Sequence, residues 1–228
     1  MVKALSTLQG PDGRVCVEGF YDEVRPPTAE ETQLLRGLVE HFDEEAKREE
    51  LGITRFRGGK PGRDLLEGYV MDPQLNINGL VAGYTGPQMQ TMLPKEAVAK
   101  VDIRMVPDMK AEDILRKLRH HLDRHGFPEV EIRTWGGYPW SRTSVRAEVA
   151  QAAMRATQIH GLESAPRPTH VACAPFSLFT EPPLGLPAIA AGLGRSGNVH
   201  VANEYFTLNG IRLLQKWVVT FLYEYARL

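Results

Sequence analysis

The order of β-rich and helix-like segments constrains the fold of this 228-residue chain more than any other feature. Four segments in its first part have β-rich or alternating patterns, namely residues 14–20, 73–80, 97–107 and 129–135. Amphipathic patterns over residues 29–51 and 110–125 predict two helices, and the first opens on a Thr28–Glu31 capping box. The resulting order, β-α-β-β-α-β, is typical of an antiparallel sheet backed by two helices.

A change of composition near residue 138, where glycine, tyrosine and proline cluster, predicts a domain boundary. Three elements are expected beyond it: a helix over 145–160, an apolar strand-like run over 186–191, and a long helix over 208–228. That alternation is consistent with one edge of a parallel α/β layer. The sequence therefore predicts an α/β protein. Residues 1–138 would form an α+β domain with an antiparallel sheet and two helices, and residues 139–228 a partial α/β layer.

Composition excludes several functional classes. The charge is balanced, with 27 basic against 28 acidic residues, which argues against broad electrostatic binding to nucleic acid or to an anionic membrane. No apolar run is long enough to span a bilayer, and the first residues lack the pattern of a signal peptide. Cys16 and Cys173 lie far apart without metal-binding spacing, so we expect free thiols in a cytoplasmic protein.

His200 lies in a polar loop between the apolar run 186–191 and the last helix. Open α/β folds place ligand-binding and catalytic groups in such loops. In this loop His200 is the side chain suited to serve as a metal ligand or to carry a proton at neutral pH. The alternative is that His200 only caps or packs at the entry of the helix.

Arg104 is the second candidate. Strand alternation over 97–107 puts Val101 and Ile103 on one face, and Asp102 and Arg104 on the other. A guanidinium on a rigid strand suits bidentate binding of a carboxylate. The alternative is a surface arginine that pairs with a neighbouring acid.

Two other patterns look like metal motifs but fall on predicted helices. His121 and Asp123 form an H-x-D triplet, yet positions i and i+2 of a helix diverge. Adjacent helical carboxylates also point about 100° apart. We therefore expect helix-surface positions for the triplet and for the acidic pairs Glu30-Glu31, Glu44-Glu45 and Glu49-Glu50.

Three blocks of residues stand out when they are taken in chain order. They are Asp12-Gly13-Arg14-Val15 with Glu18-Gly19-Phe20-Tyr21-Asp22; Asn76-Ile77-Asn78-Gly79-Leu80 with Gly83-Tyr84-Thr85-Gly86, Gln90-Thr91-Met92-Leu93-Pro94 and Asp102-Ile103-Arg104-Met105-Val106-Pro107; and His200 with Asn203-Glu204. Each block alone is only weak evidence of a relationship to a known family. Together, in this order across nearly the whole chain, they resemble the M20 metallopeptidase family, especially its carnosinase-like dipeptidases and related deacylases.

The resemblance implies a catalytic α/β domain that holds two zinc ions, and an inserted lid domain through which the enzyme forms a homodimer. It assigns residues 1–138 to the lid, without its first strand, and residues 139–228 to the last part of the catalytic domain. The substrates implied are dipeptides or N-acyl amino acids.

The same resemblance implies roles for individual residues. His200 matches a zinc ligand, Thr91 a contact to substrate or transition-state oxygens, and Arg104 the group that binds the substrate carboxylate. Asn78 lies in the same block and is a further candidate for substrate binding. Cys173 stands near the position at which the family has a substrate-contacting serine. It is therefore a candidate substrate contact, although a cysteine there departs from the family pattern.

A larger departure concerns the family's H-x-D metal motif, bridging aspartate and Glu-Glu pair, which precede the lid and have no counterpart here. The first eight residues read as the last turns of a helix, so we expect the C-terminal portion of such an enzyme, inactive and without zinc when alone. One alternative is a non-catalytic dimerisation or interaction module. A weaker one is a thiol hydrolase built on Cys173 and His200.

Overall fold

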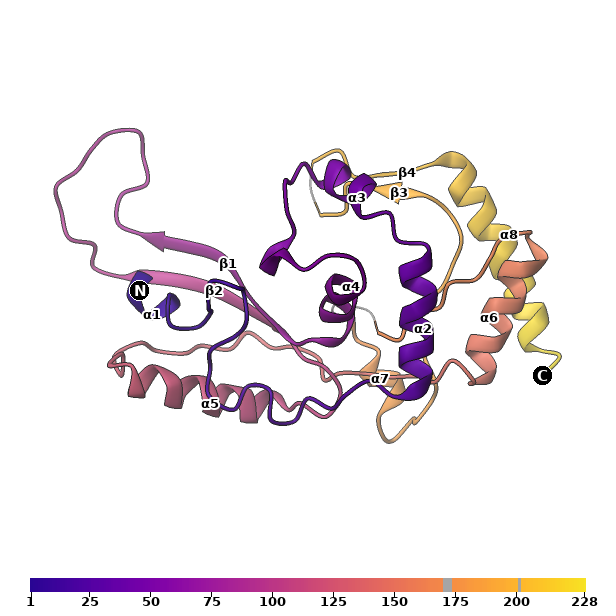
Figure 1. Ribbon diagram of the computed structural model, residues 1–228, viewed down its shortest axis with the longest axis horizontal. Helices are drawn as coiled ribbons and strands as arrows, with labels where there is room; N and C mark the ends of the chain where they lie inside the picture. Colours follow the sequence, from indigo (N-terminus) through magenta and orange to yellow (C-terminus); the bar gives the residue numbers. More distant parts are fainter. Residues whose placement is uncertain (170–173, 201) are drawn as a thin grey trace. The chain divides into compact units, whose positions relative to one another are not determined.

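The computed structural model describes residues 1–169, 174–200 and 202–228, and the chain divides into two compact units. Unit 1 comprises residues 1–140 with Thr169, and unit 2 comprises the described residues of 141–168 and 174–228. Figure 1 shows the elements of each unit in chain order. Helices and small antiparallel sheets make up both units, which confirms the predicted α/β class. None of the helices described is long and apolar enough to cross a membrane.

The sheet of unit 1 is a long antiparallel hairpin. Its strands are β1 (Gln74–Ala82) and β2 (Ala97–Arg104), as the sequence predicted (Figure 1). Gln74 pairs with Arg104 at one end, and Ala82 pairs with Ala97 at the other. The register shifts between Ile77 and Gly79, so that one extra residue bulges from β1.

The first amphipathic segment forms two helices instead of one. α2 (Ala29–Glu40) begins on the predicted capping box, in which the Glu31 backbone N donates to Thr28 Oγ1 and the Thr28 backbone N donates to Glu31 Oε2. The helix ends before Asp43, whose Oδ1 accepts from the Ala46 N at 2.9 Å and caps α3 (Glu44–Leu51). A side chain that competes for backbone donors in this way favours a new helix start over continuation.

The remaining helices of unit 1 are short, apart from the last. They are α1 (Val2–Leu5), the 3-10 turn η1 (Arg57–Gly59), α4 (Gly62–Met71) and α5 (Ala111–Arg124). α5 confirms the second predicted helix. α2 packs on α4 through Leu35, Val70 and Met71.

Two predicted strands of unit 1 are wrong. Val15 makes only an isolated bridge with Gln9, and the residues that follow turn on themselves, with the Phe20 N donating to the Val17 carbonyl. Residues 129–135 are also irregular, and Arg119 donates to the carbonyl of Val130 in that segment and to the carbonyl of Phe127 before it. Both segments place alternate apolar side chains against the core without joining the ladder. In the described part of unit 1 the sheet therefore has two strands, and the order β-α-β-β-α-β is incorrect.

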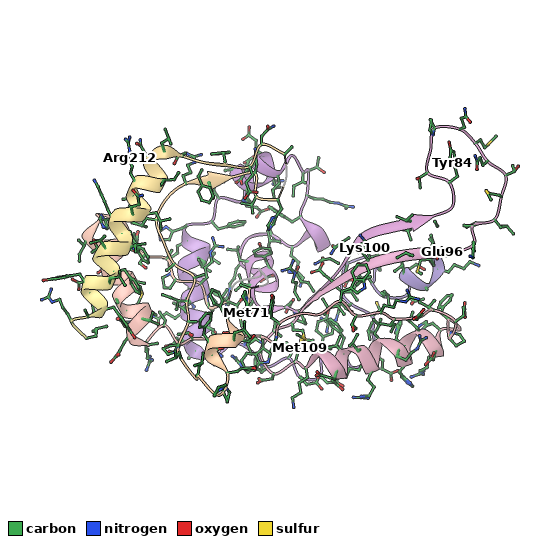
Figure 2. The ribbon with its side chains drawn as sticks, turned by 180° about the vertical axis from the view of Figure 1, so that it is seen from behind. Met71, Tyr84, Glu96, Lys100, Met109 and Arg212 are labelled. Carbon is green, nitrogen blue, oxygen red and sulfur yellow. The ribbon has the colours of Figure 1, made fainter. Side chains whose placement is uncertain are left out.

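The main core of unit 1 joins α1, the irregular segment after it, the hairpin and α5. Its buried apolar side chains include Leu8, Phe20, Leu75, Met109, Ile114 and Leu122. Burial of each such side chain contributes about 1.5–3 kcal/mol, so this cluster fixes the position of the hairpin. Figure 2 labels Met109 within it.

Unit 2 is built on two helices, α6 (Glu148–Ile159) and α8 (Leu208–Tyr225), which confirm the helices predicted there. They pack through Ala153, Ala156 and Trp217, and the indole N–H of Trp217 donates to Thr157 Oγ1 at 3.0 Å. The smaller elements are α7 (Ser177–Thr180), β3 (Ser196–Gly197) and β4 (Tyr205–Phe206).

The strand predicted over 186–191 is wrong. These residues are irregular, and the Ala188 N donates to a side chain, Thr143 Oγ1, instead of to a neighbouring strand. Among the residues described, the only β-sheet of unit 2 is the hairpin β3–β4, in which each strand has two residues. An apolar run specifies burial, but a strand also requires a partner strand beside it.

Candidate functional site

Asp102 joins two candidate residues on the β1–β2 hairpin. Its Oδ2 lies 2.6 Å from Arg104 Nε, and its Oδ1 accepts from Asn78 Nδ2 at 2.8 Å. Residues two apart on a strand face the same way, so Asp102 and Arg104 project from one face of β2. A single carboxylate thus links both strands of the hairpin.

Asn78 lies at the bulge of β1. Pairing changes from Ile77 with Val101 to Gly79 with Lys100, which leaves Asn78 as the extra residue of the strand. Asn76 is the ladder partner of Asp102, and Asn78, two residues further along β1, donates to the carboxylate of Asp102.

This geometry corresponds to one of the two alternatives for Arg104, an arginine paired with a neighbouring acid. The side chains are 38% exposed for Arg104 and 30% for Asp102. Exposed pairs of this kind contribute only about 0.2–1 kcal/mol to stability, so the contact orients the guanidinium more than it stabilises the fold. The role of Arg104 in substrate binding stays a prediction. Asp102 was not predicted as a site residue, although it stands two residues before Arg104 on the same predicted strand.

Thr91 lies in the loop that connects the two strands, and its side chain is exposed. Figure 2 shows Tyr84 on this loop and Glu96 where the chain returns to β2. Arg104 is at the opposite end of β2, and the seven residues from Ala97 span about 23 Å. Thr91 and Arg104 of one hairpin therefore do not converge on a single small ligand, and the role of Thr91 stays a prediction.

His200 lies in unit 2, in the loop between β3 and β4, and its imidazole is exposed. Its backbone N donates to Glu204 Oε2 at 3.4 Å, and Asn198 Nδ2 donates to the Asn203 carbonyl at 3.1 Å. The φ angles of Asn198, His200 and Asn203 are 55°, 65° and 64°. Left-handed backbone is uncommon for residues other than glycine, although asparagine and histidine are enriched there. Such strain, of about 1–3 kcal/mol per residue, is concentrated at functional sites.

The described residues do not by themselves fit a zinc centre. A zinc site uses about three or four protein ligands. Across residues 1–169, 174–200 and 202–228, no group of three or more His, Cys, Asp or Glu side chains could hold a metal ion. The role of His200 as a single metal ligand stays a prediction.

The two cysteines are the remaining sulfur-containing candidates. Cys173 lies outside the described residues, so its predicted substrate contact and the thiol hydrolase alternative stay predictions. Cys16 is a free, exposed thiol.

A helix-surface position was expected for His121, but its side chain is buried and only 2% exposed. Its Nε2 lies 3.0 Å from Thr7 Oγ1, and its ring stacks on His125 at 4.0 Å between centroids. Burial lowers the pKa of His121, and the neighbouring His125 lowers that pKa further. Asp123 points elsewhere and pairs with Arg119 at 2.7 Å, so the triplet does not converge.

Glu31 also departs from the expected helix-surface position. It is 1% exposed and accepts from both Arg25 Nη atoms, at 2.9 and 3.1 Å. Burial raises the pKa of Glu31, but the hydrogen bonds from Arg25 and Thr28 outweigh burial and hold that pKa below its usual value.

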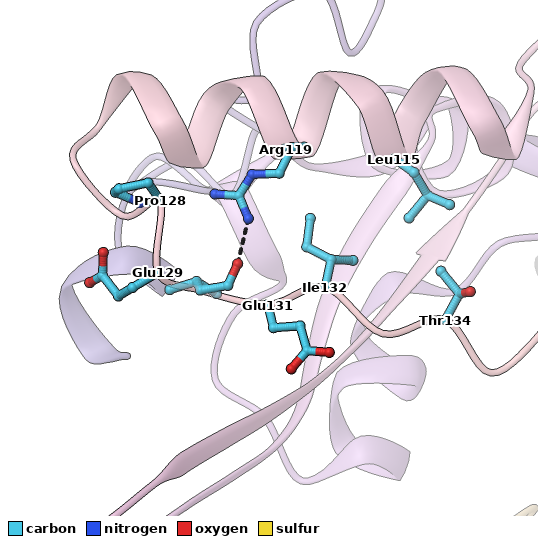
Figure 3. A pocket seen from close by; sticks show the side chains of 8 residues that line it. Leu115, Arg119, Pro128, Glu129, Glu131, Ile132 and Thr134 are labelled. Carbon is cyan, nitrogen blue, oxygen red and sulfur yellow. Dashed lines mark hydrogen bonds between the residues drawn. The ribbon is translucent and has the colours of Figure 1, made fainter.

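An open depression of about 520 Å³ lies beside α5 (Figure 3). Its lining residues are Leu115, Arg119, Pro128, Glu129, Val130, Glu131, Ile132 and Thr134. Arg119 donates to the carbonyls of Phe127, at 3.0 Å, and Val130. The guanidinium therefore ties the irregular segment to α5, and we assign it a structural role.

Comparisons with known proteins show what this chain is similar to. Residues 32–130 match the model described as the peptidase dimerisation domain, M20_dimer. The crystal structure of an M20 family metallo-carboxypeptidase from Sulfolobus solfataricus covers the whole chain with a TM-score of 0.86 at 30% identity. The chain is therefore similar to M20 peptidases in fold, and residues 32–130 are similar to their dimerisation domain.

Other M20 relatives agree. The Beta-Ala-His dipeptidase of Homo sapiens is 27% identical over 146 residues, which are 61% of this chain and 28% of the relative. The Cys-Gly metallodipeptidase of Candida albicans is 28% identical over 122 residues, which are 54% of this chain and 24% of the relative. The structure of human carnosine dipeptidase 1 covers the whole chain with a TM-score of 0.82 at 25% identity. This chain spans about half the length of the two solved structures named here, 52% and 48%.

Proposed function

We propose that this chain supplies the substrate-positioning part of a metal-dependent hydrolase that cleaves the amide bond of dipeptides or N-acyl amino acids. Its relatives include a Beta-Ala-His dipeptidase and a Cys-Gly metallodipeptidase, whose names specify dipeptides as substrates. The observation that carries the proposal is the guanidinium of Arg104, held on a rigid strand by Asp102.

In this proposal Arg104 binds the substrate carboxylate through charge-assisted hydrogen bonds. A fixed carboxylate places the amide bond at a fixed distance and lowers the entropic part of the barrier. The Thr91 hydroxyl donates to the oxyanion that forms as the amide carbonyl becomes tetrahedral. Thr91 and Arg104 lie at opposite ends of the hairpin, so the two residues of one chain would not contact the same substrate molecule.

His200 would supply one imidazole ligand, and the described residues hold no group of three or more His, Cys, Asp or Glu side chains that would complete a metal site. A zinc ion held with further ligands would supply activation of water. We propose that the chain alone lacks that activity and is a portion of a larger, cytoplasmic enzyme that forms a homodimer through residues 32–130.

Binding and turnover test the two halves of this proposal separately. The purified chain is titrated with N-acetylglycine, a carboxylate probe, and binding is followed through the NMR signals of the ligand. Arg104→Ala should abolish binding. Arg133→Ala is the matched control, because Arg133 is also an arginine paired with an acid two residues away, Glu131. Equal affinity of wild type and Arg104→Ala would remove the proposed role of Arg104.

Turnover is measured with β-Ala-His and Cys-Gly as substrates in the presence of zinc. The chain alone should leave both dipeptides intact. Zinc-dependent hydrolysis at a rate proportional to the concentration of the chain, unchanged through successive purification steps, would contradict its proposed inactivity.

A second candidate function is a non-catalytic dimerisation module. The match of residues 32–130 to a peptidase dimerisation domain favours it as an alternative. Sedimentation analysis of the chain with and without N-acetylglycine separates the two. A dimer that binds no carboxylate favours the module, whereas carboxylate binding that depends on Arg104 favours the hydrolase.

A further inference from the structure

Residues 131–135, the unpaired segment, have the side-chain pattern of a strand but no strand beside them to which they are bonded. Val130 and Ile132 pack against the core, whereas the side chains of Glu131 and Arg133 are exposed. In the described part of the chain, the backbone of residues 131–135 makes no hydrogen bond. A strand-like segment whose N–H and C=O groups are free is a template for pairing with another chain.

The depression of about 520 Å³ lies along the same residues (Figure 3). Apolar side chains of Leu115 and Ile132 line it, and so do Glu129 and Glu131. A strand that pairs with a free backbone edge also needs room for its alternate side chains. An added strand would therefore gain both backbone hydrogen bonds and apolar contacts at this place.

The charged residues that line the depression differ in their partners. Arg119 is paired with Asp123 at 2.7 Å, and Glu131 is paired with Arg133 at 2.8 Å. Within the part of the chain that the structure describes, the side chain of Glu129 makes no hydrogen bond or ion pair. A carboxylate without a neutralising partner at the edge of a docking site favours a cationic side chain in the ligand.

The strands of the chain itself are poor sources of the added strand. β1 has no charged side chain to offer to Glu129. β2 lies close to the unpaired segment, since Lys100 Nζ is 5.9 Å from the centroid of the Trp135 ring, yet the two form no ladder in the described structure. A separate polypeptide therefore fits the site better than a strand of this chain.

We propose that residues 131–135 are a docking site for an extended segment of another polypeptide, which adds to them as a β-strand. The segment alternates apolar and polar residues, and it places a lysine or arginine next to Glu129. This inference goes beyond the proposed hydrolase function, and it does not depend on the roles proposed for Arg104 or His200.

The test uses NMR of the isotope-labelled full chain. The probe is the acetylated and amidated peptide Lys-Val-Thr-Val-Lys-Val, which has the required alternation and charge. In the chain alone, the amide protons of residues 131–135 should exchange rapidly with water at every protein concentration. Saturation with the peptide should slow their exchange at least about tenfold, because they become bonded within a ladder.

Two matched peptides are the controls. One carries N-methyl groups on its backbone amides, which keeps the side chains but blocks strand pairing, and it should not protect residues 131–135. The other has glutamate in place of lysine, and it should bind at least about fivefold more weakly beside Glu129. Glu129→Gln should remove most of this difference between the two charged peptides.

Proline variants test the backbone of the segment directly. Successive N–H groups of an extended segment point to opposite edges, so Arg133→Pro and Thr134→Pro remove donors from different edges. One of the two should weaken peptide binding about tenfold. Arg133→Ala and Thr134→Ala keep the N–H groups, and they should bind within about twofold of the wild type.

The inference fails if the lysine peptide at millimolar concentration leaves residues 131–135 unprotected. It fails also if the N-methylated peptide binds equally well, or if neither proline variant weakens binding. Protection that grows with the concentration of the chain alone would identify a second copy as the occupant, and it would likewise overturn the inference. The comparison of the peptides needs no variant, so it decides the matter even where a proline variant does not fold.

Discussion

Asp102 holds Arg104 through a contact of 2.6 Å between Oδ2 and Nε, yet neither side chain is buried. Exposed ion pairs contribute about 0.2–1 kcal/mol, because water screens the charges and two side chains must be ordered. The contact therefore sets the direction of the guanidinium without adding much to the stability of the hairpin.

The first prediction concerns this difference between orientation and stability. Asp102→Ala should change the free energy of unfolding of unit 1 by less than about 1 kcal/mol. Urea denaturation followed by circular dichroism measures that change. Leu75→Ala is the contrasting variant, because Leu75 is fully buried in the core and its truncation should cost about 2–5 kcal/mol. A loss of several kcal/mol in Asp102→Ala would show that the network is part of the fold.

The second prediction concerns the start of α2. Thr28→Ala removes the acceptor for the Glu31 backbone N and should destabilise the protein by about 0.5–2 kcal/mol. Thr32→Ala is the control, because Thr32 lies one turn into the same helix and its hydroxyl only donates to the Thr28 carbonyl. Thermal unfolding compares the two. Equal effects would mean that the capping box does not determine where α2 begins.

These elements show what the sequence could predict. The Thr28–Glu31 box and the apolar stripe of α5 are local patterns, and both were confirmed. Residues 14–20 and 129–135 have equally strong β patterns, but in the described part of the chain neither segment forms a ladder with a strand. Alternation of apolar and polar residues indicates which side chains are buried. It does not determine whether the backbone forms hydrogen bonds with a neighbouring strand or with side chains such as Arg119.

The candidate site divides in the same way. The pairing of Asp102 with Arg104 follows from strand alternation, so it could be foreseen as an alternative. The contact with Asn78 could not, because it depends on the register of β1 against β2, which pairs Asn76 with Asp102 and shifts after Ile77. A one-residue shift of this kind has no signature in hydrophobic periodicity.

The third prediction concerns pH. Burial holds the pKa of His121 below its ordinary value, while Thr7 and Glu18 act in the opposite direction and His125 adds to the lowering. Because the folded protein prefers the neutral imidazole, its stability is complete above the unfolded-state pKa of about 6.5. That stability should decline as the pH falls from about 6.5 towards the lower folded-state pKa.

Urea denaturation at a series of pH values from 8 to 5 tests this prediction. His121→Gln, which can still bond to Thr7, should flatten the decline. His120→Gln is the matched control, since His120 is the adjacent and exposed histidine, and it should behave as the wild type does. A decline that persists in His121→Gln, or that disappears in His120→Gln, would assign the effect to another group.

The fourth prediction concerns the loop that carries His200. Its φ of 65° lies in the left-handed region, where a side chain of an L-residue costs about 1–2 kcal/mol and glycine costs nothing. His200→Gly should therefore stabilise unit 2, or at least leave its stability unchanged, despite the loss of a side chain. Val199→Gly is the control, because Val199 is exposed in the same loop and is not among the residues with positive φ. That substitution should only destabilise.

Thermal unfolding monitored by tryptophan fluorescence separates these outcomes, since Trp217 is buried between α6 and α8. A gain in His200→Gly alone would mean that the chain keeps histidine at this position against the preference of its backbone. Retention of a strained residue is the pattern of a functional group, which agrees with a ligand role for His200. If His200→Gly and Val199→Gly destabilise equally, the histidine side chain contributes to packing at the helix entry, and the structural alternative for His200 holds.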